Sequence, residues 1–252
     1  MDTTLQRPLL EIRTIELHTP FAWLHAGLAD LRAAPLPSLF YGLCFAVIGY
    51  GLAYALRYQP QLFAAASAGF MLLGPALAIG LYELSRRREA GLPLRLVPSL
   101  TAWRNNFHHL ALFSMVLMVV FLVWTRASEL SFTLFFSGSS PTLADMVRLI
   151  VAPDNVSFLG IWLGIGFFFA TLVFLISATT VQMMLDRNTN AISAVLTSLQ
   201  VVATNPGPMA VWAAIIAWAT AAALLMGFIG IIVVGPLLGH ASWHAYRSLV
   251  DQ

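Results

Sequence analysis

The sequence contains few charged residues, and this shortage limits the classes of protein to which it can belong. Charged residues make up 10% of the 252 residues and hydrophobic residues 59%, whereas a soluble domain carries about 25% charged residues. The 13 basic side chains are all arginine, because lysine does not occur. The formal net charge is only +2, so the chain has no electrostatic footprint for nucleic acid. These shortages exclude an ordinary soluble domain and a nucleic-acid-binding protein.

Cysteine and catalytic motifs are also scarce. Cys44 is the single cysteine, which excludes an intrachain disulfide and a zinc site built from several cysteines. The sequence has no Walker loop, no dinucleotide fingerprint, no His-Glu-x-x-His and no Gly-x-Ser-x-Gly elbow. We therefore expect a protein that is not an enzyme, and we predict neither a cofactor nor a soluble substrate.

Long apolar runs with almost no internal charge are abundant. A helix needs about 20 apolar residues to cross ~30 Å of hydrocarbon. We therefore predict an all-α, polytopic membrane protein that forms a single domain over residues 1–252 in the lipid bilayer. The prediction is six transmembrane helices arranged as three hairpins, with spans at 39–57, 62–84, 110–126, 158–185, 209–226 and 231–247.

The last two spans come from one apolar stretch, Met209–Trp243. A single helix of that length would extend about 52 Å at 1.5 Å per residue, too long for one crossing. A turn at Gly227–Gly230 resolves this, because its two glycines relax the backbone. We expect protein to cover this apolar turn, since lipid cannot satisfy bare backbone groups.

The arginines are distributed unevenly between the two sides of this topology. With six spans, both termini share a side, and that side receives ten arginines against three on the other: Arg57, Arg126 and Arg148. The positive-inside rule then predicts a multi-pass protein of the bacterial inner (cytoplasmic) membrane with both termini cytoplasmic. Residues 1–20 have no apolar signal-peptide core, so we expect a cytoplasmic N-terminal segment and a retained first span.

Two stretches of the chain resemble each other. One alignment superposes Gly74-Pro75 on Gly235-Pro236, Glu83 on His244, and Arg86 on Arg247. Semi-apolar segments precede the three hairpins, at 21–34, 97–106 and 191–204. We interpret each repeat unit as an amphipathic cytoplasmic helix followed by two spans. Chance similarity between apolar helices is the alternative.

The best candidates for chemistry lie at the end of the last span. His240 and His244 are four residues apart, so they share one helix face and favour a metal ion or the edge of a haem, with Glu83 as a carboxylate ligand. The structural alternative is that His240 bonds a neighbouring helix while His244 pairs with Glu83 at the membrane interface. A proton-linked role is the third hypothesis.

Other polar and glycine-proline positions predict structure rather than chemistry. No Asp, Glu, Lys or Arg lies near the midplane of a predicted span, which argues against an ion-coupled carrier. Proline inside a span kinks a helix. We assign structural roles to six residues, with the last two as an interfacial ion pair: Gly74, Pro75, Gly235, Pro236, Asp186 and Arg187.

Five stretches resemble a bacterial integral membrane protein family of unknown function, some members of which are labelled as cytochrome c oxidase subunits. They are Pro35–Leu39 with Tyr41-Gly42, Gly69–Pro75, Gly80–Arg86, Leu185–Arg187 and Gly239–Arg247. The resemblance extends over about residues 10–250. The chain has too few spans and deep histidines for the catalytic subunit of such an oxidase. The label therefore implies an accessory or assembly role.

The empty catalytic inventory and the resemblance lead to one function hypothesis. We expect a non-enzymatic accessory, scaffold or assembly factor of a membrane complex, with a respiratory oxidase as the complex that the resemblance implies. Its partners are then the lipid bilayer and a protein of that complex. Two alternatives stay open: transport of a lipid-like or apolar solute at the repeat interface, and metal or haem binding at the paired histidines.

Overall fold

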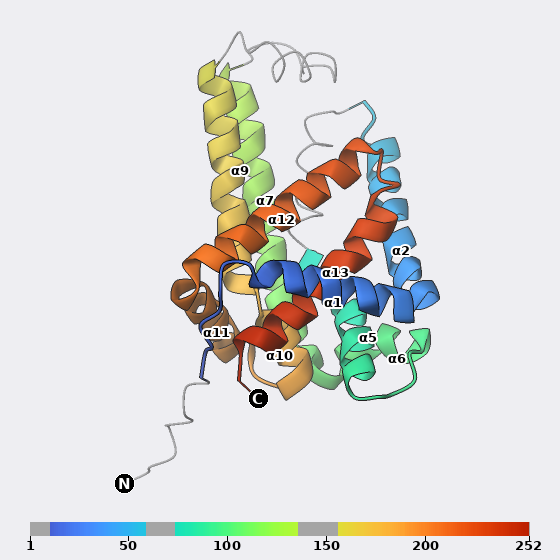
Figure 1. Ribbon diagram of the computed structural model, residues 1–252. Helices are drawn as coiled ribbons and strands as arrows, with labels where there is room; N and C mark the ends of the chain where they lie inside the picture. Colours follow the sequence, from blue (N-terminus) through green and yellow to red (C-terminus); the bar gives the residue numbers. More distant parts are fainter. Residues whose placement is uncertain (1–10, 59–73, 136–155, 252) are drawn as a thin grey trace.

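A computed structural model describes residues 11–58, 74–135 and 156–251 (Figure 1). Within these ranges the regular elements are helices, apart from one isolated β-bridge between Ile12 and Val250, so the all-α class is confirmed. The helices are α1 Thr19–Ala33, α2 Pro35–Ala55, α4 Gly74–Leu77, α5 Ile79–Glu89, α6 Leu96–Leu100, η1 Ala102–Asn106, α7 Phe107–Phe135, α9 Val156–Ser177, α10 Thr180–Arg187, α11 Ala191–Thr204, α12 Pro206–Leu225 and α13 Ile231–Leu249.

Four helical stretches are long and apolar enough to cross a membrane. They are Pro35–Ala55, Leu96–Phe135, Val156–Arg187 and Pro206–Leu225. Large apolar side chains point away from the bundle on these helices, such as Phe167 on α9 at 76% exposed and Trp218 on α12 at 77%. An apolar surface of this extent is typical of helices whose solvent is lipid. The structure therefore supports a membrane protein with several crossing helices.

The other two predicted spans differ from the expectation. Much of 62–84 lies outside the described residues, and the part that is described is broken into α4 and α5 at Ala78. The segment 231–247 forms α13, most of whose second half is buried among other helices. The layout of six spans in three hairpins thus stays a prediction.

The turn between α12 and α13 lies where the sequence predicts it. Gly227 and Phe228 both adopt left-handed backbone conformations, with φ of 66° and 63°. The hydroxyl of Tyr50 on α2 donates to the carbonyl of Gly227, and the Tyr50 and Phe228 rings lie 5.5 Å apart. Tyr50 of α2 therefore contacts one side of the turn, but Met226 and Ile229 are 66% and 61% exposed. The expected protein cover over the turn is thus only partial.

Two corners of the chain have similar backbone geometry, which supports the sequence repeat between the first unit and the last. Ala34 joins α1 to α2 with φ −132° and ψ 60°, and Asn205 joins α11 to α12 with φ −123° and ψ 52°. A proline follows each of them as the first residue of the next helix. Proline disfavours helical geometry in the residue before it and suits the first helical turn. The local sequence therefore imposes both corners.

The short helices are arranged in cyclic order around three central ones. The central helices α5, α10 and α13 pack against one another. Around them, α6 and η1 pack on α5, α11 packs on α10 and α9, and α1 packs on α13. In Figure 1, α1 runs crosswise to the upright pair α7 and α9. Each semi-apolar segment thus lies against the helix that ends the preceding unit, and the first segment lies against the last helix.

The three central helices end at matching arginines. Arg86, Arg187 and Arg247 occupy the last turns of α5, α10 and α13. The helix is interrupted eight residues before the first two, at Ala78 and Thr179, whereas α13 continues through the equivalent Gly239 with Pro236 inside it. This common spacing supports a repeat of three units, each ending at one of these arginines.

Candidate functional site

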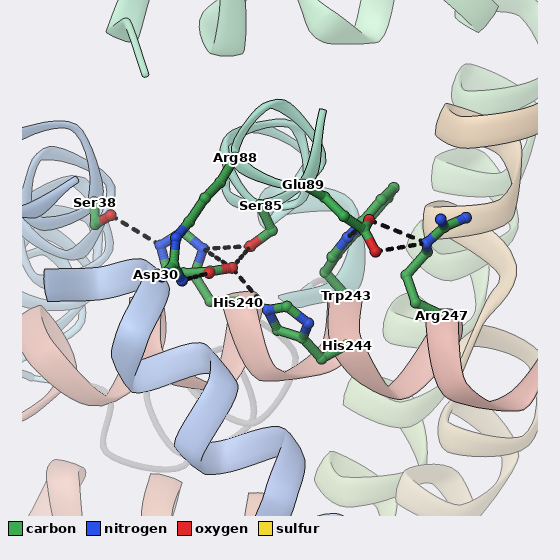
Figure 2. Close-up of polar contacts among 9 residues, drawn as sticks. All are labelled: Asp30, Ser38, Ser85, Arg88, Glu89, His240, Trp243, His244 and Arg247. Atoms are coloured by element: carbon green, nitrogen blue, oxygen red, sulfur yellow. Dashed lines mark hydrogen bonds and ion pairs between the residues drawn. The ribbon is translucent and has the colours of Figure 1, made fainter. Parts of the chain in front are cut away.

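Polar side chains from four helices meet in one buried group where α1, α2, α5 and α13 come together (Figure 2). We call these six residues the Asp30 cluster: Asp30 on α1, Ser38 on α2, Ser85 and Arg88 on α5, and His240 and His244 on α13. The close helix packing needed for this has a local cause at Gly27. A Cβ at that position would lie 2.7 Å from the backbone nitrogen of Ala241, so only glycine lets α1 lie so near α13.

Asp30 is the hub of the cluster. Its side chain is 3% exposed, and its Oδ2 accepts from the Ser85 hydroxyl and, at 2.9 Å, from Nε2 of His244. Its other oxygen accepts from the Arg88 guanidinium. Burial alone would raise the pKa of Asp30, but the hydrogen bonds from His244, Ser85 and Arg88 outweigh it and lower that pKa to about 2. Asp30 is therefore a carboxylate at physiological pH.

His240 is bonded at both ring nitrogens. It is 0% exposed, with Nε2 2.8 Å from the Ser38 hydroxyl and Nδ1 2.7 Å from the Ser85 hydroxyl. A carboxylate only accepts, so the single Ser85 proton goes to Asp30 and Ser85 must accept from His240. Nδ1 of His240 is then the protonated nitrogen, and a neutral ring accepts the Ser38 proton at Nε2. The cluster thus fixes one imidazole tautomer.

A second polar group joins α5, α10 and α13. On α13, the Trp243 indole donates to Glu89 at 3.1 Å, and Arg247 bonds the same carboxylate at 3.0 Å. Arg247 also reaches Asp186 at 3.3 Å. Asp186 and Arg187 were predicted to pair with each other, but the described contacts link them through the Tyr246 hydroxyl, at 2.8 and 3.0 Å. The reason is that neighbouring residues on a helix point in different directions.

The carboxylate of Glu83 binds arginines rather than the paired histidines. Its carboxylate accepts from Arg86 at 2.8 and 3.0 Å and lies 3.6 Å from Arg87. Among the described contacts none joins Glu83 to either histidine, and Asp30 takes the place beside His244 that we predicted for Glu83. Across residues 11–58, 74–135 and 156–251, no group of three His, Cys, Asp or Glu residues is arranged to hold a metal ion. Metal or haem binding stays a prediction.

The four glycine-proline positions have structural surroundings. Gly74 and Pro75 begin the single turn α4, directly before the interruption at Ala78. Pro236 is buried inside α13, and a Cβ at Gly235 would lie 2.8 Å from the Phe45 ring. A Cβ at Gly74 would meet open space, so the structural roles assigned to these four residues stay a prediction.

Sequence reasoning missed Asp30, Ser38, Ser85 and Arg88. A usable signal existed for Asp30, because it is an acid in the last turn of a semi-apolar segment, directly before the proline corner. An acid at the C-terminal end of a helix is opposed by the helix dipole and needs another cation or donor. Nothing in the sequence identified Arg88 and His244 as those partners, since they lie 58 and 214 residues away.

Comparison with known proteins adds a family but no activity. Residues 62–186 match a family model described as "Predicted integral membrane protein (DUF2189)". No curated protein and no solved structure matches the chain. The matched segment includes Ser85, Arg88 and Glu83, and the family description mentions no oxidase. Over residues 62–186, about half of its length, the chain is therefore similar to a family of predicted integral membrane proteins of unknown function.

Proposed function

We propose that the protein is a non-enzymatic accessory, scaffold or assembly factor of a membrane complex in the bacterial inner membrane. In this proposal it crosses the membrane six times and keeps both termini in the cytoplasm. The observation that carries the proposal is the internal engagement of the Asp30 cluster. The carboxylate and both imidazoles of the cluster are bonded to side chains of the same protein.

The strongest enzymatic alternative is a hydrolase. A chain of contacts leads from Ser38 through His240 towards Asp30, as in a Ser-His-Asp triad. In such a triad the acid bonds the imidazole directly, whereas Asp30 Oδ2 lies 3.9 Å from Nδ1 with Ser85 bridging the two. A nucleophile must also reach its substrate. Ser38 is fully buried beneath α13, which favours a structural role for the three residues.

The scaffold role is supported by the separation of a polar network inside the molecule from apolar side chains on its outside. The polar network fixes four helices to one another, while α2, α7, α9 and α12 present large apolar side chains outward. A rigid core with apolar faces suits a protein whose task is to hold neighbours within the bilayer.

Co-purification tests this role. The full chain is extracted in mild detergent after cross-linking in intact cells, and native mass spectrometry measures the stoichiometry of what accompanies it. We expect one membrane protein at a fixed ratio, and Phe167→Ala or Trp218→Ala on the outer faces to weaken that association without changing expression. Recovery of a lone monomer under several growth conditions would contradict the proposal.

A second candidate, transport of a lipid-like solute, has one observation in its favour. The apolar stretch that contains α9 and α10 is interrupted at Thr179, and discontinuous helices are common at transporter sites. Within the described part of the chain, the Thr179 hydroxyl and the Gln182 Oε1 are buried there without a hydrogen-bond partner. Protein-dependent movement of a fluorescent phospholipid across vesicles, lost in Thr179→Val, would favour this function over the scaffold.

A further inference from the structure

The segment that leads into α7 exposes a row of large apolar side chains. It comprises the residues from Leu92 to the start of α6, together with α6, η1 and the first turn of α7. Val97, which is 71% exposed, shows the pattern most clearly. We call the following set the interfacial stripe: Leu92, Val97, Leu100, Trp103 and Phe107.

The opposite side of the same segment is fixed to the protein core. The Ser99 hydroxyl lies 2.9 Å from the Tyr41 hydroxyl on α2. The Asn106 amide donates to the carbonyls of Met184 and Thr189, at 3.0 and 2.9 Å, and Ala102 is buried. These contacts hold the segment in one orientation, so the stripe cannot turn inward to hide its apolar surface.

Two exposed arginines lie between the apolar residues of the stripe. Arg95 and Arg104 are exposed, and neither forms an ion pair with the residues that the structure describes. The Arg104 guanidinium lies 5.4 Å from the centre of the Trp103 ring, and the Phe107 ring lies 5.5 Å from the same ring. Exposed aromatic rings beside an exposed guanidinium group suit the boundary between acyl chains and headgroups.

We propose that the interfacial stripe binds acidic phospholipids of the cytoplasmic leaflet. The apolar side chains enter the upper acyl region, while Arg95 and Arg104 pair with headgroup phosphates. Charge complementarity selects this occupant, since the two arginines have no ion-pair partner among the described residues and, in this placement, face a leaflet that carries net negative charge. The inference rests on the proposed cytoplasmic placement of this end, and it is independent of the scaffold role.

A second exposed apolar row provides an internal comparison. Helix α11 presents Ile192, Leu196 and Leu199, spaced four and three residues apart, and contains no arginine. That spacing places them on one face of the helix. We expect α11 to enter the same leaflet through apolar burial alone. Its depth should therefore not depend on lipid charge.

The test uses the single native cysteine of the chain. Full-length Cys44→Ser protein receives one new cysteine, through Val97→Cys, Leu196→Cys or Asn105→Cys, and carries an environment-sensitive dye. Each variant is placed in nanodiscs of phosphatidylcholine with or without phosphatidylglycerol. We expect the dyes at 97 and 196 to be quenched by nitroxide lipids, and the dye at the exposed, polar position 105 to be quenched by aqueous iodide. Only the dye at 97 should move deeper when phosphatidylglycerol is added.

Charge removal separates headgroup binding from simple burial. Arg95→Gln or Arg104→Gln should each weaken the preference for phosphatidylglycerol about fivefold, since one basic residue near a membrane contributes about that factor. Arg57→Gln, outside this segment, is the control and should leave the phosphatidylglycerol-dependent depth of the dye at 97 unchanged. Equal iodide quenching at 97 and 105 would overturn the proposal, and so would a dye at 97 that is shielded in native membranes but not in nanodiscs, because that result indicates a protein partner. A lone monomer in the co-purification experiment would leave the lipid result standing.

Discussion

Asp30 shows how a single residue controls the junction of four helices. Its carboxylate bonds to two helices other than its own, and through Ser85 it orients His240, which reaches the fourth. Removing one partner of a buried ion pair costs about 3–5 kcal/mol when both groups are buried. Arg88 is partly exposed, so we expect Asp30→Ala to cost about 3 kcal/mol.

The pH dependence of stability reports on the same carboxylate. Its pKa is about 2 in the folded protein, against an ordinary 3.8. A lowered folded pKa means that the contribution of Asp30 is complete above pH 3.8 and is lost as the pH falls towards 2. We expect this loss to amount to about 1–2 kcal/mol. Unfolding in detergent between pH 5 and 2 should show it in wild type and not in Asp30→Asn; equal acid sensitivity of the two proteins would contradict the assignment.

The hydrogen bonds of His240 predict which ring nitrogen carries the proton and that Ser38 and His240 are energetically coupled. Ser38→Ala leaves Nε2 as a buried acceptor without a donor, which costs about 1–3 kcal/mol. The same serine change in a His240→Leu background should cost much less, so a double-mutant cycle should show coupling. Nitrogen NMR of labelled histidine should find the proton on Nδ1. Additive mutations together with a proton on Nε2 would refute the described network, and Ser193→Ala, on an exposed serine, is the control.

The same contacts predict the metal content of the purified protein. Nδ1 and Nε2 of His240 both bond to serines, and Nε2 of His244 bonds to Asp30, so a metal ion would have to displace protein partners. We expect the purified protein to contain no stoichiometric metal and no Soret absorption. A stoichiometric ion that is lost in His240→Ala and His244→Ala would establish the alternative hypothesis.

At the scale of the elements, glycine sets the distance between α2 and α13. A Cβ at Gly42 would lie 2.0 Å from the carbonyl oxygen of Ile232, whereas a Cβ at Gly51 on the same helix has open space around it. We expect Gly42→Ala to destabilise the protein by about 2 kcal/mol or more, because overpacking forces the backbone to move. Gly51→Ala should be neutral or stabilising by up to about 1 kcal/mol. Thermal unfolding of the two variants, side by side, tests this contrast; equal effects would contradict the packing.

Elements that depend on local chemistry were predictable from the sequence, and contacts between elements were not. The corners before Pro35 and Pro206 and the turn at Gly227 follow from proline and glycine geometry. The break at Thr179 has no glycine or proline beside it, and it occurs where Ser198 of α11 binds the backbone of α9 and the Thr179 amide. In a membrane helix both the lipid-facing and the inward side chains are apolar, so periodicity did not reveal which face meets which helix.

The distribution of arginines over the whole molecule predicts which end of the bundle faces the cytoplasm. The ends of α5, α10 and α13 gather the arginines at one end of the bundle, as the positive-inside rule requires of a cytoplasmic surface. Reporter fusions should therefore place the connection from Arg86 to Arg104 in the cytoplasm, with green fluorescent protein active and alkaline phosphatase inactive. The reverse pattern would overturn the topology and the assignment of the interfacial stripe to the cytoplasmic leaflet.

The packing of α1 on α13 has a consequence for how the protein is made. Helix α1 is synthesised well before α13, the helix against which it packs, and the other described helices are made between the two. Until then Asp30 lacks His240 and His244, and Ile12 lacks Val250. The junction between α1 and α13 therefore forms only after α13 has been synthesised, and during that interval the newborn chain depends on the membrane, or on an insertion chaperone, to shelter α1.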